Sequence, residues 1–263
     1  MENKNGESRI PVEEVIRQLD SLLAENRGED GEKHLYYWLE QAKKDGDWRG
    51  ELTIQNELMG YHRTSRKETL GLKAVERGIQ LIQEYGLEET VTGGTTYLNG
   101  ATTLKAFGRT EAAMPYYRKA EEIYHRYLEE GDYRMAGLYN NLGLAWKDMG
   151  EFEKARDYYG KALAVMEKLP GGEMELAVTW VNLAGLYETW EKDLDRREEQ
   201  TGFCMRKAWT YLNAPGYPEN GYYAFTCTKC APEFGHFGYF SMQRELEQRA
   251  ARIYGREQAD ERA

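Results

Sequence analysis

Apolar side chains recur three and four residues apart along most of the chain, the spacing that places them on one face of an α-helix. The pattern is clearest over residues 137–169, where two such stretches flank Gly150. The first stretch shares one face among Tyr139, Leu142, Gly143 and Trp146, and the second among Phe152, Ala155, Tyr159, Ala162 and Met166. Because glycine commonly follows the last turn of a helix, the segment predicts a helical hairpin that turns at Gly150.

The same hairpin recurs along the sequence. Asn99, Asn141 and Asn182 occupy one position of successive first helices, at intervals of 42 and 41 residues. A further copy lies 42 residues upstream of Asn99, where Glu57 replaces the asparagine and Asn56 precedes it. The second helices align too, Phe107–Ala113 with Met149–Ala155. Self-similarity at a fixed period is typical of solenoids, so we predict an all-α fold of stacked helical hairpins.

This pattern divides the chain into three predicted parts. An N-terminal helical hairpin covers residues 1–46, and a C-terminal capping hairpin covers residues 217–263. Between them, residues 47–216 hold four repeats, with approximate bounds 47–90, 91–132, 133–172 and 173–216. The apolar spacing predicts individual helices over Val12–Glu25, Lys33–Lys44, Thr201–Leu212, Tyr222–Ala231 and Phe240–Tyr254, with a charged extension, Trp190–Gln200, before the third and with Gly235 and Gly238 in the last turn.

The repeated unit resembles the tetratricopeptide repeat (TPR) family. That family carries an aromatic residue, Leu-Gly and a second aromatic residue in its first helix, then alanine, an aromatic residue and alanine in its second. The matching residues, in register, are Tyr139, Leu142, Gly143, Trp146, Ala155, Tyr159 and Ala162. The period near 42, instead of the usual ~34, is similar to the longer variant of kinesin light chains and bacterial peptide-sensing regulators. The resemblance implies a right-handed α-α superhelix with a concave groove that binds a protein or peptide.

A second resemblance concerns the source. From about Asp47 onward the sequence is similar to a group of TPR proteins common in anaerobic Gram-positive bacteria, through the segments Asn56–Gly60 and Cys227–Pro232. This resemblance implies a bacterial protein and adds no activity.

The asparagine row is the first candidate site. In the resembled family this position faces the groove, which implies that Asn99, Asn141 and Asn182, together with Asn56, contact a bound peptide. An asparagine side chain offers donors and an acceptor, so it can pair with both polar groups of a peptide backbone. The alternative is that these amides bond neighbouring helices or face water.

A row of cations is the second candidate. Arg63, Lys105 and Lys147 lie six residues beyond the asparagine position, and Glu188 takes their place in the fourth repeat. Three cations in an acidic chain can attract an acidic peptide or a C-terminal carboxylate. The simpler alternative is a solvated helix end, where Lys and Arg interact favourably with the helix dipole.

The cysteines allow three interpretations. Cys227 and Cys230 share one face of a predicted helix, where cysteine commonly packs as a small apolar group. The same spacing occurs in metal and redox sites, with Cys204 and His236 as further metal ligands. A structural zinc site normally needs four well-placed ligands and a redox pair a preceding strand, so we prefer the core interpretation and expect no cofactor.

The net charge of −10, from 45 acidic and 35 basic residues, bounds the partners. Nucleic acids and anionic membranes require clustered cations, so neither is an expected partner. No apolar run approaches the ~20 residues that span a bilayer, and no apolar stretch follows the polar segment Met1–Arg9. Three cysteines suit a reducing compartment, and we expect a cytoplasmic protein.

No catalytic motif is present in the sequence, because the four histidines are scattered and no nucleophile elbow or P-loop occurs. We therefore predict a scaffold or adaptor without enzymatic activity, which binds a partner segment in its groove and can form a homodimer through its terminal helices. One alternative is a peptide-sensing regulator that acts through a separate effector. Another is a metal-binding or redox protein built on the cysteine pair.

Overall fold

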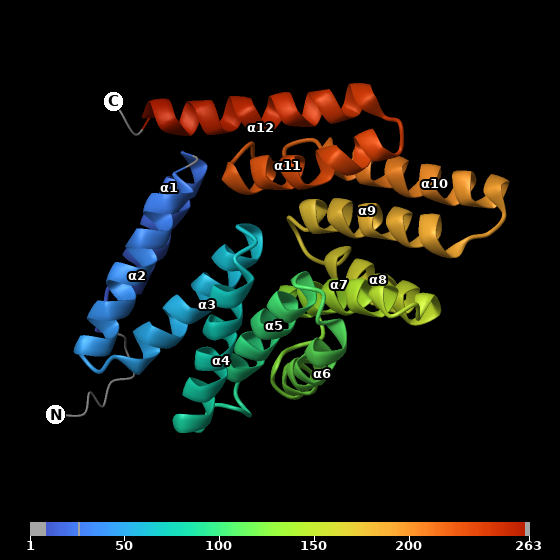
Figure 1. The fold of residues 1–263 in the computed structure, drawn as a ribbon. Coiled ribbons are helices and arrows are strands. Elements are labelled where there is room, and N and C mark those ends of the chain that lie inside the picture. The colour runs from blue at the N-terminus through green and yellow to red at the C-terminus, as the bar shows by residue number, and fades with distance from the viewer. Residues whose placement is uncertain (1–8, 26, 261–263) are drawn as a thin grey trace. The chain divides into compact units, whose positions relative to one another are not determined.

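The computed structural model describes residues 9–25 and 27–260, with side chains as far as residue 255. The polar segment Met1–Arg9, in which the sequence shows no secretory signal, therefore lies outside the described residues, apart from Arg9. Within the described part, twelve helices and no strand are present (Figure 1). The helices group into two compact units that meet in the sequence between Tyr127 and Leu128, inside the predicted array of repeats.

The first unit consists of three antiparallel hairpins. Their helices are α1 (Val12–Ala24), α2 (Gly28–Lys44), α3 (Trp48–Thr64), α4 (Glu68–Glu84), α5 (Val91–Ala106) and α6 (Thr110–Tyr127). Each hairpin packs its second helix against the first helix of the next, and α3 also packs against α5. The unit is therefore a stack of hairpins in which the first helices α3 and α5 adjoin each other.

The second unit repeats this arrangement. Its helices are α7 (Tyr133–Asp148), α8 (Phe152–Met166), α9 (Glu173–Trp190), α10 (Leu194–Leu212), α11 (Gly221–His236) and α12 (Phe240–Asp260). The first helix α9 packs against both α7 and α11, and α8 packs against α9. The predicted all-α class and the stacked hairpins are confirmed. None of the twelve helices is both long and apolar enough to cross a membrane.

Glycine at the end of the first helix makes the turn within a hairpin. Gly150 has φ 77°, a left-handed conformation that costs other residues energy. Its N–H donates to the Lys147 carbonyl oxygen at 2.9 Å, and the next N–H, of Glu151, donates to the Trp146 carbonyl oxygen at 2.9 Å. These bonds satisfy carbonyl groups left over at the end of α7, which is why the chain reverses there.

Close approach of α7 and α8 depends on the glycine of the Leu-Gly pair. A Cβ atom on Gly143 would lie 2.6 Å from the Tyr159 ring, well inside contact distance. The Tyr159 side chain is fully buried, as are Ala155 and Ala162 on the same face of α8. The small residues and the aromatic ring therefore interlock, as the sequence pattern predicts.

Three helix boundaries differ from the predictions. Helix α2 begins at Gly28 and not at Lys33, because Gly31 fits against Leu19 of α1, where a Cβ atom would lie 3.2 Å from its Cδ1. Helix α10 begins seven residues before Thr201, because the Asp193 carboxylate accepts a hydrogen bond from the Arg196 N–H and caps the helix. Residues 194–200 of the charged segment are thus part of α10, whereas Trp190 is the last residue of α9.

The turn before α12 is also shorter than predicted. Helix α11 continues through Gly235 to His236, so Gly235 lies inside the helix. A Cβ atom there would collide with the Gln243 side chain of α12. Gly238, with φ 84°, makes the turn alone.

One buried histidine in the first unit lacks a full set of hydrogen bonds. His62 of α3 is completely buried, and its Nε2 lies 3.2 Å from the Tyr36 hydroxyl. Its Nδ1 has no hydrogen-bond partner in the described part of the chain. Glu32 Oε1 lies 3.8 Å from that nitrogen, and Glu32 is itself paired with Lys67. Burial therefore lowers the pKa of His62 below its ordinary value of 6.5.

We expect the first unit to lose stability as the pH falls below about 6.5. In the unfolded chain His62 takes up a proton near its ordinary pKa, whereas the buried imidazole stays neutral to lower pH, so the unfolded state binds more protons. Urea titrations at about pH 7.5 and about pH 5 measure the effect. The drop in unfolding free energy between the two should be smaller for His62→Gln than for the wild type, and equal drops would contradict the assignment.

Candidate functional site

The asparagines of the first unit bond to each other across neighbouring first helices. Asn99 on α5 donates from Nδ2 to Oδ1 of Asn56 on α3, at 2.8 Å. Asn56 donates to the Leu52 carbonyl oxygen at 3.0 Å and to Thr96 Oγ1 at 3.2 Å. The Asn56 amide therefore donates once within α3 and once across to α5.

A similar bond joins the first helices of the second unit. Asn182 on α9 donates from Nδ2 to Oδ1 of Asn140 on α7, at 2.9 Å. Asn141 instead donates to the Gly137 carbonyl oxygen of its own helix, at 2.8 Å. Sequence reasoning missed Asn140, although the doubled asparagine at positions 140 and 141 was a visible signal.

The bonds divide the asparagines into two groups. Asn99, Asn141 and Asn182 each use one N–H within the protein and retain a second N–H and the carbonyl oxygen, with no further partner in the described part of the chain. Asn56 and Asn140 accept from their neighbours and act as supports. All five side chains are partly exposed. The sequence analysis left open that these amides bond neighbouring helices. Asn99 and Asn182 each do so through one N–H.

The equivalent position on α3 holds a carboxyl group. Glu57 is partly buried, and desolvation, followed by the negative charge of Asp20 on α1, raises its pKa. No cation pairs with it among the described residues.

The cation row is less uniform than the sequence suggests. Burial lowers the pKa of Arg63, and no carboxylate pairs with it in the described part of the chain. Lys147 reaches α9, where its Nζ lies 3.1 Å from the position of a Cβ atom on Gly185. Gly185 is three residues beyond Asn182, so in the second unit a cation and an asparagine lie on neighbouring turns. In the fourth repeat Glu188 pairs with His236 at 2.7 Å.

All three cysteines are free and buried in the core of the second unit. Burial raises the pKa of Cys204 and Cys230 to about 12 and that of Cys227 to about 11, so the thiols are held protonated. His236, the other residue considered as a ligand, has its ring at the exposed end of α11. Across the described residues, no group of three or more His, Cys, Asp or Glu side chains is placed to hold a metal ion.

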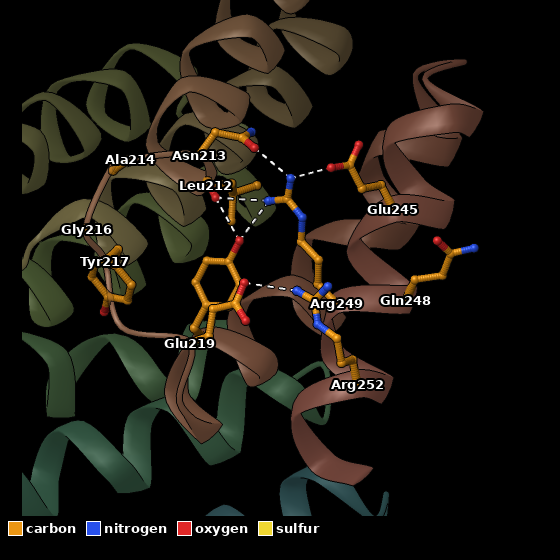
Figure 2. A pocket seen from close by; sticks show the side chains of 11 residues that line it. Leu212, Asn213, Ala214, Gly216, Tyr217, Glu219, Glu245, Gln248, Arg249 and Arg252 are labelled. Carbon is orange, nitrogen blue, oxygen red and sulfur yellow. Dashed lines mark hydrogen bonds and ion pairs between the residues drawn. The ribbon is translucent and has the colours of Figure 1, made fainter. Parts of the chain in front are cut away.

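A polar cavity of about 480 Å³, which the sequence did not predict, lies in the second unit beside the loop between α10 and α11 (Figure 2). Its wall contains Arg249 of α12, whose side chain is 16% exposed. The guanidinium donates to the Leu212 carbonyl oxygen at 3.2 Å, to the Tyr223 hydroxyl at 2.7 Å and to Asn213 Oδ1 at 2.7 Å. It also pairs with Glu245.

The charges of this cavity neutralise one another. Figure 2 shows Arg249 among its acceptors and Arg252 directed to Glu219, with Nη2 and Oε1 2.9 Å apart. The Tyr223 hydroxyl donates in turn to the Leu212 carbonyl oxygen at 2.9 Å. The guanidinium of Arg249 satisfies the carbonyl group at the end of α10. We therefore interpret Arg249 as a clamp that holds α12 to the loop between α10 and α11.

The comparisons with known proteins agree with this architecture. Models of the tetratricopeptide repeat match residues 95–124 and residues 134–195. The crystal structure of BtubC (BKLC) from P. vanneervenii is similar with a TM-score of 0.56 and 21% identity, over 80% of this chain and 94% of that one. A putative kinesin light chain of Podosopora anserina with nearly identical TPR-like repeats is similar with a TM-score of 0.53 and 14% identity, over 78% and 95%. No curated protein is significantly similar in sequence.

At these identities the likeness is one of fold. It confirms the predicted class of α-α superhelix built from TPR hairpins. A fold of this kind supports a general role as a protein–protein interaction scaffold. The repeat models thus identify tetratricopeptide repeats within residues 95–195, and the structural neighbours share the same hairpin fold.

Proposed function

We propose that the protein binds an extended segment of a partner protein along the first helices of its hairpins. The observation that carries the proposal is the hydrogen-bonding capacity left on Asn99, Asn141 and Asn182. Each retains an N–H and a carbonyl oxygen, the two groups that pair with one peptide unit of a bound backbone. Such pairing holds a backbone without selecting its side chains.

The supporting amides make this capture more effective. Asn56 fixes the side chain of Asn99, and Asn140 fixes that of Asn182, so less rotamer freedom is lost on binding. The Gly137 carbonyl oxygen fixes Asn141 in the same way. Within each unit the amides are thus oriented before a peptide arrives.

Charge supports an acidic or C-terminal segment as the partner. Arg63 is partly desolvated and has no carboxylate partner among the described residues, and a ligand carboxylate would supply one. Lys147 lies one helical turn from Asn182. The free, protonated thiols are consistent with the reducing cytoplasm expected for such a scaffold.

Substituting the capturing asparagines should weaken binding at least about tenfold, since each removes hydrogen bonds worth about 1 kcal/mol. Peptides selected from a displayed random library on the full chain supply the probe, and fluorescence polarisation of a labelled peptide gives its affinity. Asn141→Ala with Asn182→Ala, both in the second unit, should lose affinity. Gln83→Ala, an exposed amide on α4, is the matched control and should bind as the wild type does.

Thermal unfolding by circular dichroism establishes that both variants are folded. A selected peptide that binds the double variant with wild-type affinity would overturn the proposal. The proposal would also fail if Gln83→Ala lost as much affinity for the peptide as the double variant does.

A further inference from the structure

A second cavity of the second unit, of about 530 Å³, opens between α8, α9 and α10. Helix α8 packs against α9, and α9 against α10, whereas α8 and α10 make little contact with each other. Gly160 of α8 contributes to the opening, because a Cβ atom on it would meet no atom within 4 Å. The volume falls in the range of ~300–1,000 Å³ typical of small-molecule sites.

Aromatic rings form the walls. Trp180 and Tyr187 rise from α9, and Phe203 faces them from α10. The Trp180 and Phe203 rings meet edge to face, with centroids 5.6 Å apart. The Phe203 side chain is 46% exposed, so part of its ring is open to solvent. A flat aromatic ligand would cover this ring and gain edge or stacking contacts with it.

The polar groups of the cavity favour an anion. Arg206 lines the cavity, and its guanidinium has no ion pair or hydrogen bond in the described part of the chain. Arg156, on the opposite wall, is 3.7 Å from Asp157, its neighbour in sequence, and has no hydrogen-bonded carboxylate. Glu199 is the one acidic residue in the lining. Two guanidinium groups against one carboxylate are notable in a chain of net charge −10.

One buried polar atom among the lining residues lacks a partner. Gln200 Oε1 is an acceptor with no hydrogen bond within the described residues. Unsatisfied buried groups are uncommon and mark places where a ligand or water can complete a structure. Gln200 is one of the residues that line the cavity.

We propose that this cavity binds a small aromatic carboxylate of about two rings, held by the rings of Trp180 and Phe203 and by the guanidinium of Arg206. The site is formed by second helices and one face of α9, and it includes none of the asparagines of the peptide-binding proposal. It therefore constitutes a second, independent ligand site.

Isothermal titration of the full chain with 1-naphthaleneacetate tests the proposal. We expect a dissociation constant on the order of 0.1 mM, which suits a ligand of this size in an open site. The neutral isostere 1-naphthaleneacetamide should bind at least about tenfold more weakly, because it lacks the charge that Arg206 meets. Equal binding of acid and amide, or no binding of the acid at about 10 mM, would overturn the proposal.

Substitutions locate the ligand. Gly160→Leu fills the opening without a clash and should abolish binding, while the leucine favours the helix. Gly137→Leu makes the same change on α7, also without a neighbour within 4 Å, and should bind as the wild type does. Arg206→Gln should remove the preference for acid over amide.

Asn182→Ala separates the two proposals, since it should leave naphthaleneacetate binding unchanged even if peptide binding is lost. Wild-type affinity in a folded Gly160→Leu variant would exclude the cavity. The cavity would also be excluded if Gly137→Leu lost as much affinity for naphthaleneacetate as Gly160→Leu does.

Discussion

Replacing Gly143 with leucine should lower the free energy of unfolding of the second unit by about 3 kcal/mol or more. The Cβ atom would lie 2.6 Å from the Tyr159 ring, and the rest of the side chain would have to enter space that the ring fills. The Tyr159 ring has little space to move, because it projects from α8 into the core and is completely buried against α7 and the next hairpin. Either the ring or the packing of the two helices must shift.

Gly137→Leu is the control in the same helix. Gly137 is exposed, and no atom lies within 4 Å of the place where its Cβ would be. Leucine favours a helix interior over glycine by up to about 1 kcal/mol, so this variant should be neutral or more stable. Urea unfolding followed by circular dichroism compares the two. If both substitutions changed stability by the same amount, the interlocking of Gly143 and Tyr159 would not be what limits the approach of the helices.

Removing the guanidinium of Arg249 should have a comparable effect, a loss of about 3 kcal/mol in Arg249→Met. Methionine keeps most of the apolar stem but leaves the Leu212 carbonyl oxygen and the Tyr223 hydroxyl with fewer partners. It also removes the bond to Asn213 in the loop before α11. The side chain is 16% exposed, so water replaces these bonds poorly.

Arg252→Met provides the comparison, because Arg252 lies in the same cavity and the same helix. Its side chain is 50% exposed, and it forms an ion pair with Glu219, whose side chain is 44% exposed. Surface pairs of this kind contribute about 0–1 kcal/mol. A loss of less than about 1 kcal/mol in Arg249→Met would show that the clamp does not stabilise the loop.

The regular features of the fold could be predicted because they follow from spacing. Apolar residues three and four apart locate the helices, and Gly150 locates a turn, independently of anything distant in the sequence. The first residues of α2 and α10 could not be predicted in this way. Residues 28–32 look like a polar break until Gly31 is seen to fit against Leu19, a contact that no local pattern contains.

The candidate site shows the same division. The repeat identified Asn99, Asn141 and Asn182, which retain free hydrogen-bonding groups. It could not reveal that Asn140 supports Asn182, because intervals of 41 and 42 residues leave the register uncertain by one position. The cavity of Arg249 joins a loop to a helix more than thirty residues away in sequence, so its members share no pattern.

The buried thiols give the protein a built-in reporter. Cys204, Cys227 and Cys230 all belong to the second unit, and their raised pKa values keep the nucleophilic thiolate scarce while they are enclosed. Alkylation by a pulse of iodoacetamide should therefore count openings of that unit alone, because the first contains no cysteine. Because Cys204 lies on α10 whereas Cys227 and Cys230 lie on α11, mass spectrometry of the three peptides would distinguish the opening of one of these two hairpins from the cooperative opening of both.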